Sequence, residues 1–446
     1  MTDFIARLKQ ALDKMPPGPE MVVGLSGGVD SVVLLHSLTQ LRLESVFSSS
    51  LRALHVNHGL HPQADSWQQF CMNLCKDLKV PFTAERVAVT ATGSVESMAR
   101  EARYRVFAAS LENGAALMLA QHLDDQLETL FLRLMRGAGP RGLAGMPHCR
   151  PLGAGILYRP FLDFTRAELV AQARAAALEW IEDPSNADTG PDRNYLRHRV
   201  LPLVEARWPD YRIRCSRSSD LLREADTLLD EMARDDLESI GSHDGAGLEL
   251  EPLLKLSAAR QRNLLRHWLS LLALPVPGWH QLQELSRELG GDFSQRESGF
   301  ELDGVSLQQH RGYLFAIKLG AASRPTESHW NAVDQTLKSL PGNGQLQARH
   351  RIGRGLGRLH ADNLEIRYRQ GGESIRLPGR PTKSLKKLLQ EAGVATWLRC
   401  RLPLLYRDEH LVCVPGIGPR EDCAAGPDEE GIVIDWHAPD FAQRPA

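Results

Sequence analysis

The first part of the chain alternates short apolar runs with patterns typical of amphipathic helices. Apolar residues recur at helical spacing in 31–39, 66–78 and 123–136. Strands are predicted between such helices, at 21–25, 51–56, 82–89, 115–120 and 156–161. Alternation of this kind predicts an α/β fold with a doubly wound parallel sheet. Ligands of such sheets bind at the carboxyl ends of the strands.

The chain is too long for a single hydrophobic core. Its 446 residues predict two or three domains, and the alternation stops near residue 205. Beyond that point we predict helices at 217–237, 252–273 and 279–289, a hairpin at 300–317, and a linker rich in Pro, Gly, Ser and Asn at 320–348. The predicted organisation is a parallel-sheet domain at 1–215 and two smaller α+β domains at 216–320 and 345–440.

A glycine-rich loop, SGGVDS, joins the first predicted strand to the first helix after it. Gly27 and Gly28 allow a ligand to approach the backbone closely, and the N–H groups at the helix start favour a phosphate. Asp30 repels phosphate directly, but it suits a loop that also binds magnesium. The loop lacks the lysine of a Walker loop and the spacing of a dinucleotide fingerprint. A plain turn without a ligand is the alternative.

Two acids follow the strand at 115–120. Helical spacing puts Leu127 and Leu130 on the buried side of the next helix, and Asp125 and Glu128 on the opposite side. The pair could hold magnesium, bind a cationic substrate or accept a proton. A solvated helix start is the alternative, because the helix dipole favours acids there.

The net charge of −2 conceals strongly basic segments. Residues 129–162 contain five arginines and 345–361 contain four, and neither segment contains a carboxylate. Lys383, Lys386 and Lys387 are predicted to open a helix, where lysine opposes the helix dipole. Contact with phosphate would give such segments a purpose. Solvated loops and a solvated helix face are the alternatives.

The cysteines indicate a reducing compartment, the cytoplasm. There are seven, with no Cys-x-x-Cys pair, which argues against disulfides and structural zinc. Cys71 and Cys75 share an apolar helical stripe and are predicted to be core residues. No apolar run has membrane-spanning length, so we expect no membrane contact.

The motifs together are similar to those of one family. SGGVDS resembles the signature of the PP-loop (N-type) ATP pyrophosphatases, which cleave ATP between its α and β phosphates. The chain resembles the tRNA(Ile)-lysidine synthetases within that superfamily through HVNHGL (55–60), QHLDDQLETLFLRLMRGAGPRGLAGM (121–146), EDPSN (182–186) and RNYLRHRVLPLV (193–204). One departure is QHLDD, where His-His-x-Asp-Asp is common.

This resemblance implies an ATP-dependent carbon–nitrogen ligase that binds RNA. The ε-amine of free L-lysine would join C2 of the wobble cytidine in the CAU anticodon of tRNA(Ile). The cytidine oxygen would first be adenylated, lysine would then displace AMP, and the codon read would change from AUG to AUA. ATP and Mg²⁺ are the implied cofactors, and the sequence is compatible with a homodimer.

The resemblance also assigns roles to residues. The ATP-binding set would be Ser26, Gly27, Gly28, Val29, Asp30, Ser31 and His55. Asp30 and Asp125 would hold magnesium, and Glu128 with Asp125 would bind or deprotonate the lysine amine. Arg103, Asn194 and Arg197 would act near the α-phosphate, with a surface position as the alternative for Arg103. The predicted tRNA contacts are Arg380, Lys383, Lys386 and Lys387.

Three other functions stay open on the sequence alone. A PP-loop tRNA thiolase normally needs paired cysteines, which this chain lacks. A small-molecule amidotransferase needs a glutaminase domain, and one kind needs a cysteine where Thr2 stands. A catalytically inactive RNA-binding protein would have no use for Asp30, Asp125 and Glu128.

Overall fold

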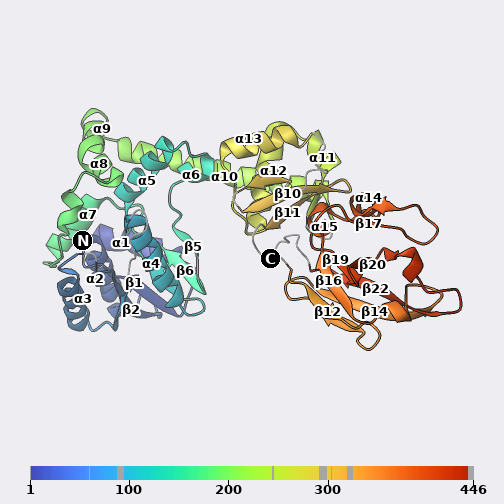
Figure 1. The fold of residues 1–446 in the computed structure, drawn as a ribbon. Helices are drawn as coiled ribbons and strands as arrows, with labels where there is room; N and C mark the ends of the chain where they lie inside the picture. The colour runs from blue at the N-terminus through green and yellow to red at the C-terminus, as the bar shows by residue number, and fades with distance from the viewer. Residues whose placement is uncertain are drawn as a thin grey trace. The chain divides into compact units, whose positions relative to one another are not determined.

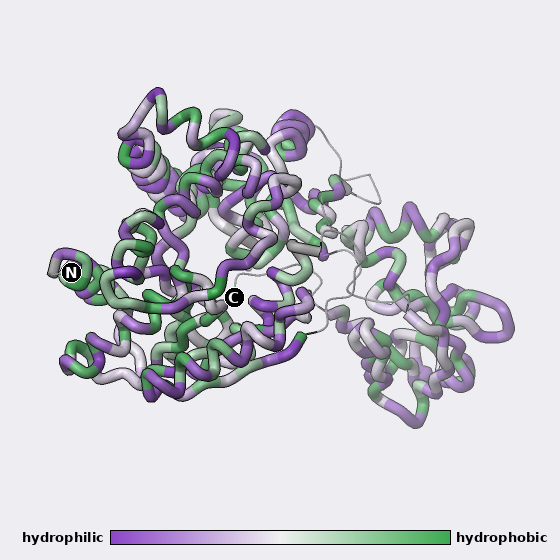
Figure 2. The backbone as a smooth tube through the Cα atoms, turned by 90° about the vertical axis from the view of Figure 1, so that its left-hand side faces the viewer, coloured by the Kyte–Doolittle hydropathy of each residue, from purple (hydrophilic) through white to green (hydrophobic). Residues whose placement is uncertain are grey.

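A computed structural model describes residues 2–59, 61–87, 95–243, 246–290, 299–302, 304–318 and 325–439 (Figure 1). The chain divides into two compact units, Met1–Leu228 and Leu229–Ala446. Along the helices, hydrophobic and hydrophilic residues alternate, as expected for elements with one buried face (Figure 2). No helix in the described ranges is long and apolar enough to cross a membrane.

The first unit is built on a six-stranded sheet, in the order β3-β2-β1-β4-β6-β5. Five strands are parallel, namely β1 (Glu20–Gly24), β2 (Ser50–Asn57), β3 (Phe82–Arg86), β4 (Ala116–Met118) and β6 (Gly155–Tyr158). They confirm the predicted fold class, although residues 88–89 of the strand expected at 82–89 lie outside the described residues. Strand β5 (Cys149–Leu152) runs antiparallel to β6 at the edge. The sequence did not predict β5, because Arg150 and Pro151 interrupt any apolar run there.

Helices cover both faces of this sheet. One face packs against α1 (Thr2–Asp13), α2 (Val29–Leu43), α3 (Ala64–Asp77) and α7 (Arg166–Ala175). The other face packs against α4 (Val95–Ala109) through Phe107. Successive residues of β1 point to opposite faces of the sheet. Val23 packs in the core on the α1 and α2 side, and Val22 packs in the core on the α4 side. Cys71 and Cys75 are fully buried on α3, which confirms their assignment to the core.

The position of the ligand site follows from the strand order. Strand β1 pairs with β2 on one side and with β4 on the other. The chain therefore leaves these central strands in opposite directions, and a crevice opens at their carboxyl ends. Residues 25–28 after β1 and 119–122 after β4 border that crevice. Helix α5 (Leu123–Met135) begins there.

The second unit contains three larger antiparallel sheets. The first consists of β7 (Ser242–His243), β8 (Gly247–Glu249), β9 (Phe300–Leu302), β10 (Val305–His310) and β11 (Tyr313–Lys318), and it shares a core with α11 (Leu250–Lys255), α12 (Ala258–Leu271) and α13 (Trp279–Glu288). The second consists of β12 (Ser328–Trp330), β16 (Leu364–Tyr368), β19 (Pro403–Arg407), β20 (His410–Val414) and β21 (Gly418–Pro419). The third consists of β13 (Leu337–Ser339), β14 (Gln345–Ile352), β15 (Leu356–Gly357) and β22 (Glu430–His437).

Several predictions for this region were wrong. The linker predicted at 320–348 contains β12, β13 and the start of β14, and Trp330 and Leu340 are buried; residues 320–324 lie outside the described residues. The helix predicted at 252–273 is two helices, because Leu256 is extended and Ser257 caps the second helix by accepting from the Arg260 N–H. Helix α10 (Tyr211–Ile240) runs through the boundary predicted at 215. The three domain ranges stay a prediction.

One polar contact ties α1 to α7. Thr165 caps α7, and Glu168 accepts from the Thr165 N–H at 2.7 Å, which completes a capping box. Arg7 of α1 forms an ion pair with the same carboxylate. Partial burial raises the pKa of Glu168, but the hydrogen bonds from Thr165 and Arg7 outweigh it and hold the pKa below its usual value. The ionised form of Glu168 therefore stabilises the fold.

We predict that Glu168→Gln lowers the melting temperature at pH 7. The expected loss is about 1 kcal/mol, since the pair is partly exposed. Because the pKa of Glu168 is lower in the folded than in the unfolded state, the carboxylate stabilises the fold at pH values above its unfolded-state pKa. This stabilisation is lost as the pH falls through the folded-state pKa. The gap between variant and wild type should therefore close below about pH 4. Thermal unfolding across pH, with the exposed Glu112→Gln as control, tests this; a gap that persists at pH 3 contradicts it.

Candidate active site

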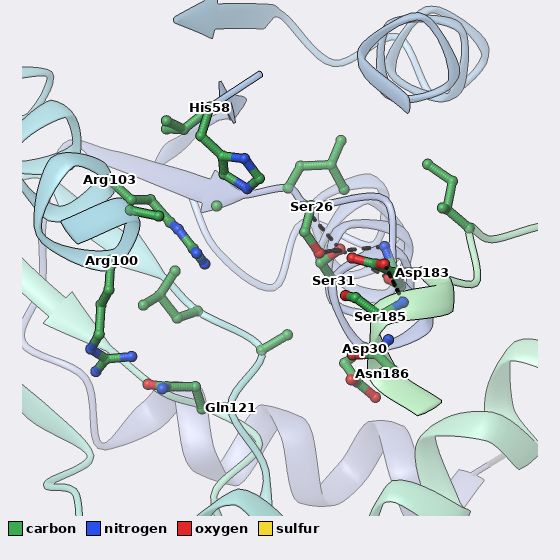
Figure 3. A pocket seen from close by; sticks show the side chains of 18 of the residues that line it. Ser26, Asp30, Ser31, His58, Arg100, Arg103, Gln121, Asp183, Ser185 and Asn186 are labelled. Atoms are coloured by element: carbon green, nitrogen blue, oxygen red, sulfur yellow. Dashed lines mark hydrogen bonds between the residues drawn. The ribbon is translucent and has the colours of Figure 1, made fainter. Parts of the chain in front are cut away.

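A cavity of about 810 Å³ lies at the carboxyl ends of β1, β2 and β4 (Figure 3). Its wall comes from the loops after these strands, from α4, and from the segment 181–197. Ser26, Asp30 and Ser31 form one side with Asp183, while Arg100 and Gln121 enter from the opposite side (Figure 3). The cavity thus has an acidic, loop-bearing end and a basic end.

The SGGVDS loop is held in shape by its own side chains. The Gly28 N–H donates to Ser26 Oγ at 3.3 Å, and Ser31 Oγ donates to the Gly28 carbonyl at 3.0 Å. Gly27 has a φ of 89°, and a Cβ there would lie 2.5 Å from Ile181 Cδ1. The Ile181 N–H donates to the Gly27 carbonyl at 2.9 Å. Only glycine fits this position, because any side chain would be strained and would displace Ile181.

The predicted ATP-binding residues divide into two groups. Ser26, Gly28, Asp30, Ser31 and His55 line the cavity. His55 Nδ1 lies 2.8 Å from the Leu25 carbonyl, and burial lowers the pKa of the imidazole. Gly27 and Val29 do not line the cavity: Gly27 packs against Ile181, and the Val29 side chain belongs to the core under the loop. For these two residues only a backbone role is open.

Asp30 and Asp125 both face the cavity, on either side of His122. His122 Nε2 lies 3.7 Å from Asp30 Oδ2 and 3.5 Å from Asp125 Oδ2, and its side chain is 2% exposed. Asp30 Oδ1 is buried without a hydrogen-bond partner, and burial raises the pKa of this carboxyl group. An unpartnered, desolvated carboxylate oxygen is what a cation would satisfy.

Glu128 lies elsewhere than predicted. Its carboxylate is fully buried and is held by two guanidinium groups rather than facing outward. Arg193 Nε and Arg197 Nε each donate to it at 2.6 Å. Arg193 Nη2 also lies 3.1 Å from Asp125 Oδ1. Arg193 and Arg197 line the cavity, whereas Glu128 stands behind them. Its geometry suits the positioning of two arginines, not the binding of an ammonium group.

Other predicted residues occupy the remaining wall. Arg103 lines the cavity from α4. Asn194 also lines it, but its amide donates to the Asp188 carbonyl at 2.8 Å and to the Ser185 carbonyl at 3.1 Å, so it shapes the 185–188 loop. Sequence reasoning missed Arg193 and His122. The spacing of Arg193 and Arg197, four residues apart, was a signal that both face Glu128.

The predicted tRNA-binding residues lie in the second unit. Arg380, Lys386 and Lys387 are exposed. Lys383 does not open the helix as predicted: it belongs to β18 (Lys383–Ser384), and α14 (Leu385–Glu391) begins after it. Its ammonium forms an ion pair with Glu391 at 2.7 Å. The basic surface at this helix therefore rests mainly on Arg380, Lys386 and Lys387.

The parallel sheet and the glycine-rich loop at its switch point define the class of PP-loop ATP-binding enzymes. Family models agree: a PP-loop domain matches residues 1–204, the TilS substrate binding domain 248–315, and the TilS substrate C-terminal domain 364–436. A tRNA(Ile)-lysidine synthase of Pseudomonas aeruginosa is 43% identical and spans 97% of both chains. One of Coxiella burnetii is 37% identical over 97% of this chain and 96% of its own.

The chain belongs to the tRNA(Ile)-lysidine synthase family. Among solved structures, a U34-tRNA thiolase of Methanococcus maripaludis matches with a TM-score of 0.42 and 17% identity, over 50% of this chain and 79% of its own.

We predict that Glu128→Gln destabilises the first unit. Removing one charge from a buried pair leaves the partners uncompensated, which costs about 3 kcal/mol. The double variant Glu128→Gln/Arg193→Gln should lose less stability than the sum of the two single variants. In the double variant neither member of this ion pair remains to lack its partner. Hydrogen exchange of the α5 amides measures these changes, with the exposed Glu101→Gln as control. If Glu128→Gln keeps α5 stable and raises only the KM for lysine, the amine-binding role stands instead.

Proposed function

We propose the following assignment of roles for a chain whose family activity is the ATP-dependent formation of lysidine in tRNA(Ile). The ε-amine of free L-lysine joins C2 of the wobble cytidine of the CAU anticodon. The cytidine O2 first attacks the α-phosphorus of ATP and pyrophosphate leaves. The lysine amine then attacks C2, AMP leaves with that oxygen, and the amine loses a proton. One observation carries this proposal: a single cavity combines the PP-loop, the carboxylates of Asp30 and Asp125, and the fixed guanidinium groups of Arg193 and Arg197.

The loop end of the cavity suits the pyrophosphate part of ATP. The Ser26 and Ser31 hydroxyls and the N–H groups at the start of α2 are donors that a phosphate requires. His55 lies on β2, next to the strand that leads into the loop. Burial lowers the pKa of its imidazole, so the ring is neutral and suits contact with the nucleotide. Asp30 would repel the phosphates unless a cation lies between them.

A magnesium ion fits that position. Mg²⁺ is usually held by one or two carboxylates together with substrate phosphates and waters. No group of three protein ligands exists among the described residues, and Asp30 and Asp125 supply the two that such a site needs. When bound, the ion would neutralise phosphate charge during transfer. The unpartnered Asp30 Oδ1 supports this role.

Arg193, Arg197 and Arg103 suit the α-phosphate, where charge develops during adenylation. Glu128 fixes the first two in place and is a positioning residue. Rigid guanidinium groups cost no reorganisation when the transition state forms. Asn194 keeps the neighbouring loop in shape. Asp125, which also contacts Arg193, would serve the ion while ATP is bound and the lysine amine in the second step, after pyrophosphate has left.

The wild-type protein tests the function directly. We expect it to transfer labelled lysine into the CAU isoleucine tRNA, with AMP and pyrophosphate released in equal amounts. The methionine tRNA with the same anticodon is the specificity control. Release of AMP without label in the RNA would contradict lysine as the nucleophile. Absence of both in folded protein would favour the inactive RNA-binding alternative. Sedimentation of the same sample tests the predicted homodimer.

Lys386 and Lys387 should contact tRNA phosphates, because both ammonium groups are exposed at one helix start. We predict that Lys386→Gln/Lys387→Gln weakens tRNA binding and lowers the slope of log Kd against log salt by about 2. Lys383→Gln should have a smaller effect, because Glu391 already holds this lysine. Filter binding over a salt series measures the slopes. An unchanged slope for the double variant would remove α14 from the tRNA interface.

A further inference from the structure

A cluster of arginines surrounds Tyr104 on α4. The guanidinium carbon of Arg100 lies 5.0 Å from the ring centroid, and that of Arg150, on β5, lies 5.2 Å from it. Arg159, just after β6, also interacts electrostatically with Tyr104 and with both other arginines. Two members come from the arginine-rich segment 129–162, to which the proposed function gives no role.

Arg159 is the unusual member of this cluster, since it is 3% exposed. Its Nε donates to Gln121 Oε1, and its Nη1 donates to the Pro147 carbonyl at 2.8 Å. Both acceptors are neutral. Among the described residues, Arg100, Arg150 and Arg159 form no ion pair with a carboxylate. Four other partly buried arginines of the same unit do pair with a carboxylate: Arg52, Arg193, Arg197 and Arg212. Arg133 is less buried than Arg159 and donates only to the Gly142 and Gly145 carbonyls.

Such an arrangement is unfavourable without an anion. A buried cation loses its hydration and is normally paired. Burial lowers the pKa of Arg159, and the neighbouring arginines lower it further against the opposing effect of Tyr104. Three like charges around one ring repel one another, and the faces of one tyrosine compensate only part of this. The missing negative charge is therefore expected from a ligand.

The cluster adjoins the cavity at the end away from the PP-loop. Arg100, Tyr104 and Gln121 line the cavity, and Arg100 and Gln121 lie across it from Ser26 and Ser31 (Figure 3). A base that reacts inside a closed pocket must leave its stack, and its flanking phosphates then reach the pocket rim. Those phosphates would meet this cluster, while the phosphates of ATP occupy the loop end.

We propose that Arg100, Arg150 and Arg159 form a binding site for phosphate oxygens, and that the ligand is a phosphodiester of the tRNA strand beside the target nucleotide. The inference rests on the proposed function, because it takes that RNA as substrate. Arg159, the buried member, supplies fixed positive charge behind the site. Arg100 and Arg150 are the groups that contact the phosphate. The site holds the backbone while the base reaches the α-phosphate.

The test compares Arg100→Gln and Arg150→Gln with wild type. Arg105→Gln is the matched control, since Arg105 is exposed on the same helix one residue beyond Tyr104. Each cluster variant should weaken binding of tRNA(Ile) three- to tenfold and lower the salt slope by about 0.7, as for one phosphate contact on a single strand. The Kd of a non-hydrolysable ATP analogue should not change. Arg105→Gln should alter neither quantity.

A second arm identifies the phosphate. tRNA(Ile) is prepared with one uncharged methylphosphonate linkage at each anticodon-loop position in turn. At one position beside the wobble cytidine, wild type should lose the affinity that Arg150→Gln has already lost, and the two changes should not add. If the variants bind ATP analogue more weakly but tRNA normally, the ligand is ATP. Full additivity at every position would also overturn the inference. Both results count only if wild type forms lysidine; if it does not, the proposed function has failed instead.

Discussion

The catalytic end of the first unit depends on one buried carboxylate. Glu128 sits on α5 with 0% exposure and accepts hydrogen bonds from Arg193 and Arg197. It thereby joins the helix after β4 to two arginines that are 65 and 69 positions further along the chain. Without this contact, the two guanidinium groups would keep only their longer contacts with Asp125. The cavity wall at 193–197 is thus held in place more by ion pairs than by hydrophobic contacts.

Charge is distributed in the cavity so that two anionic ligands, one bound with a cation and one bound without, would bind at different ends. Asp30 and Asp125 lie at the PP-loop end, where they would turn away free phosphate but accept it together with a cation. Arg100 lies on α4, at the other wall. With the proposed roles, a nucleotide bound with its metal and an RNA strand bound without one would occupy the same cavity without competing for the same groups. Separation by charge of this kind needs no moving part.

The sequence predicted what local patterns encode. Alternating apolar runs predicted the parallel strands, and the apolar stripe on α3 predicted the burial of Cys71 and Cys75. It did not predict β5 or β12, whose short runs are interrupted or lie in polar surroundings. It placed Glu128 on an exposed face, because helical spacing within α5 carries no information about Arg193. It included Val29 in the ATP site through its motif, while its side chain packs in the core. Burial by distant segments is a tertiary property.

The buried charges of this unit also bear on its stability. Asp30 is kept without a hydrogen-bond partner for Oδ1, and burial raises the pKa of its carboxyl group. Arg159 is kept without a carboxylate among the described residues. Each group makes the fold without ligands less stable than a neutral residue of the same shape would. An ion of opposite charge, when bound, would supply the missing partner of each group. If the proposed ions bind there, they would stabilise the folded state at both ends of the cavity.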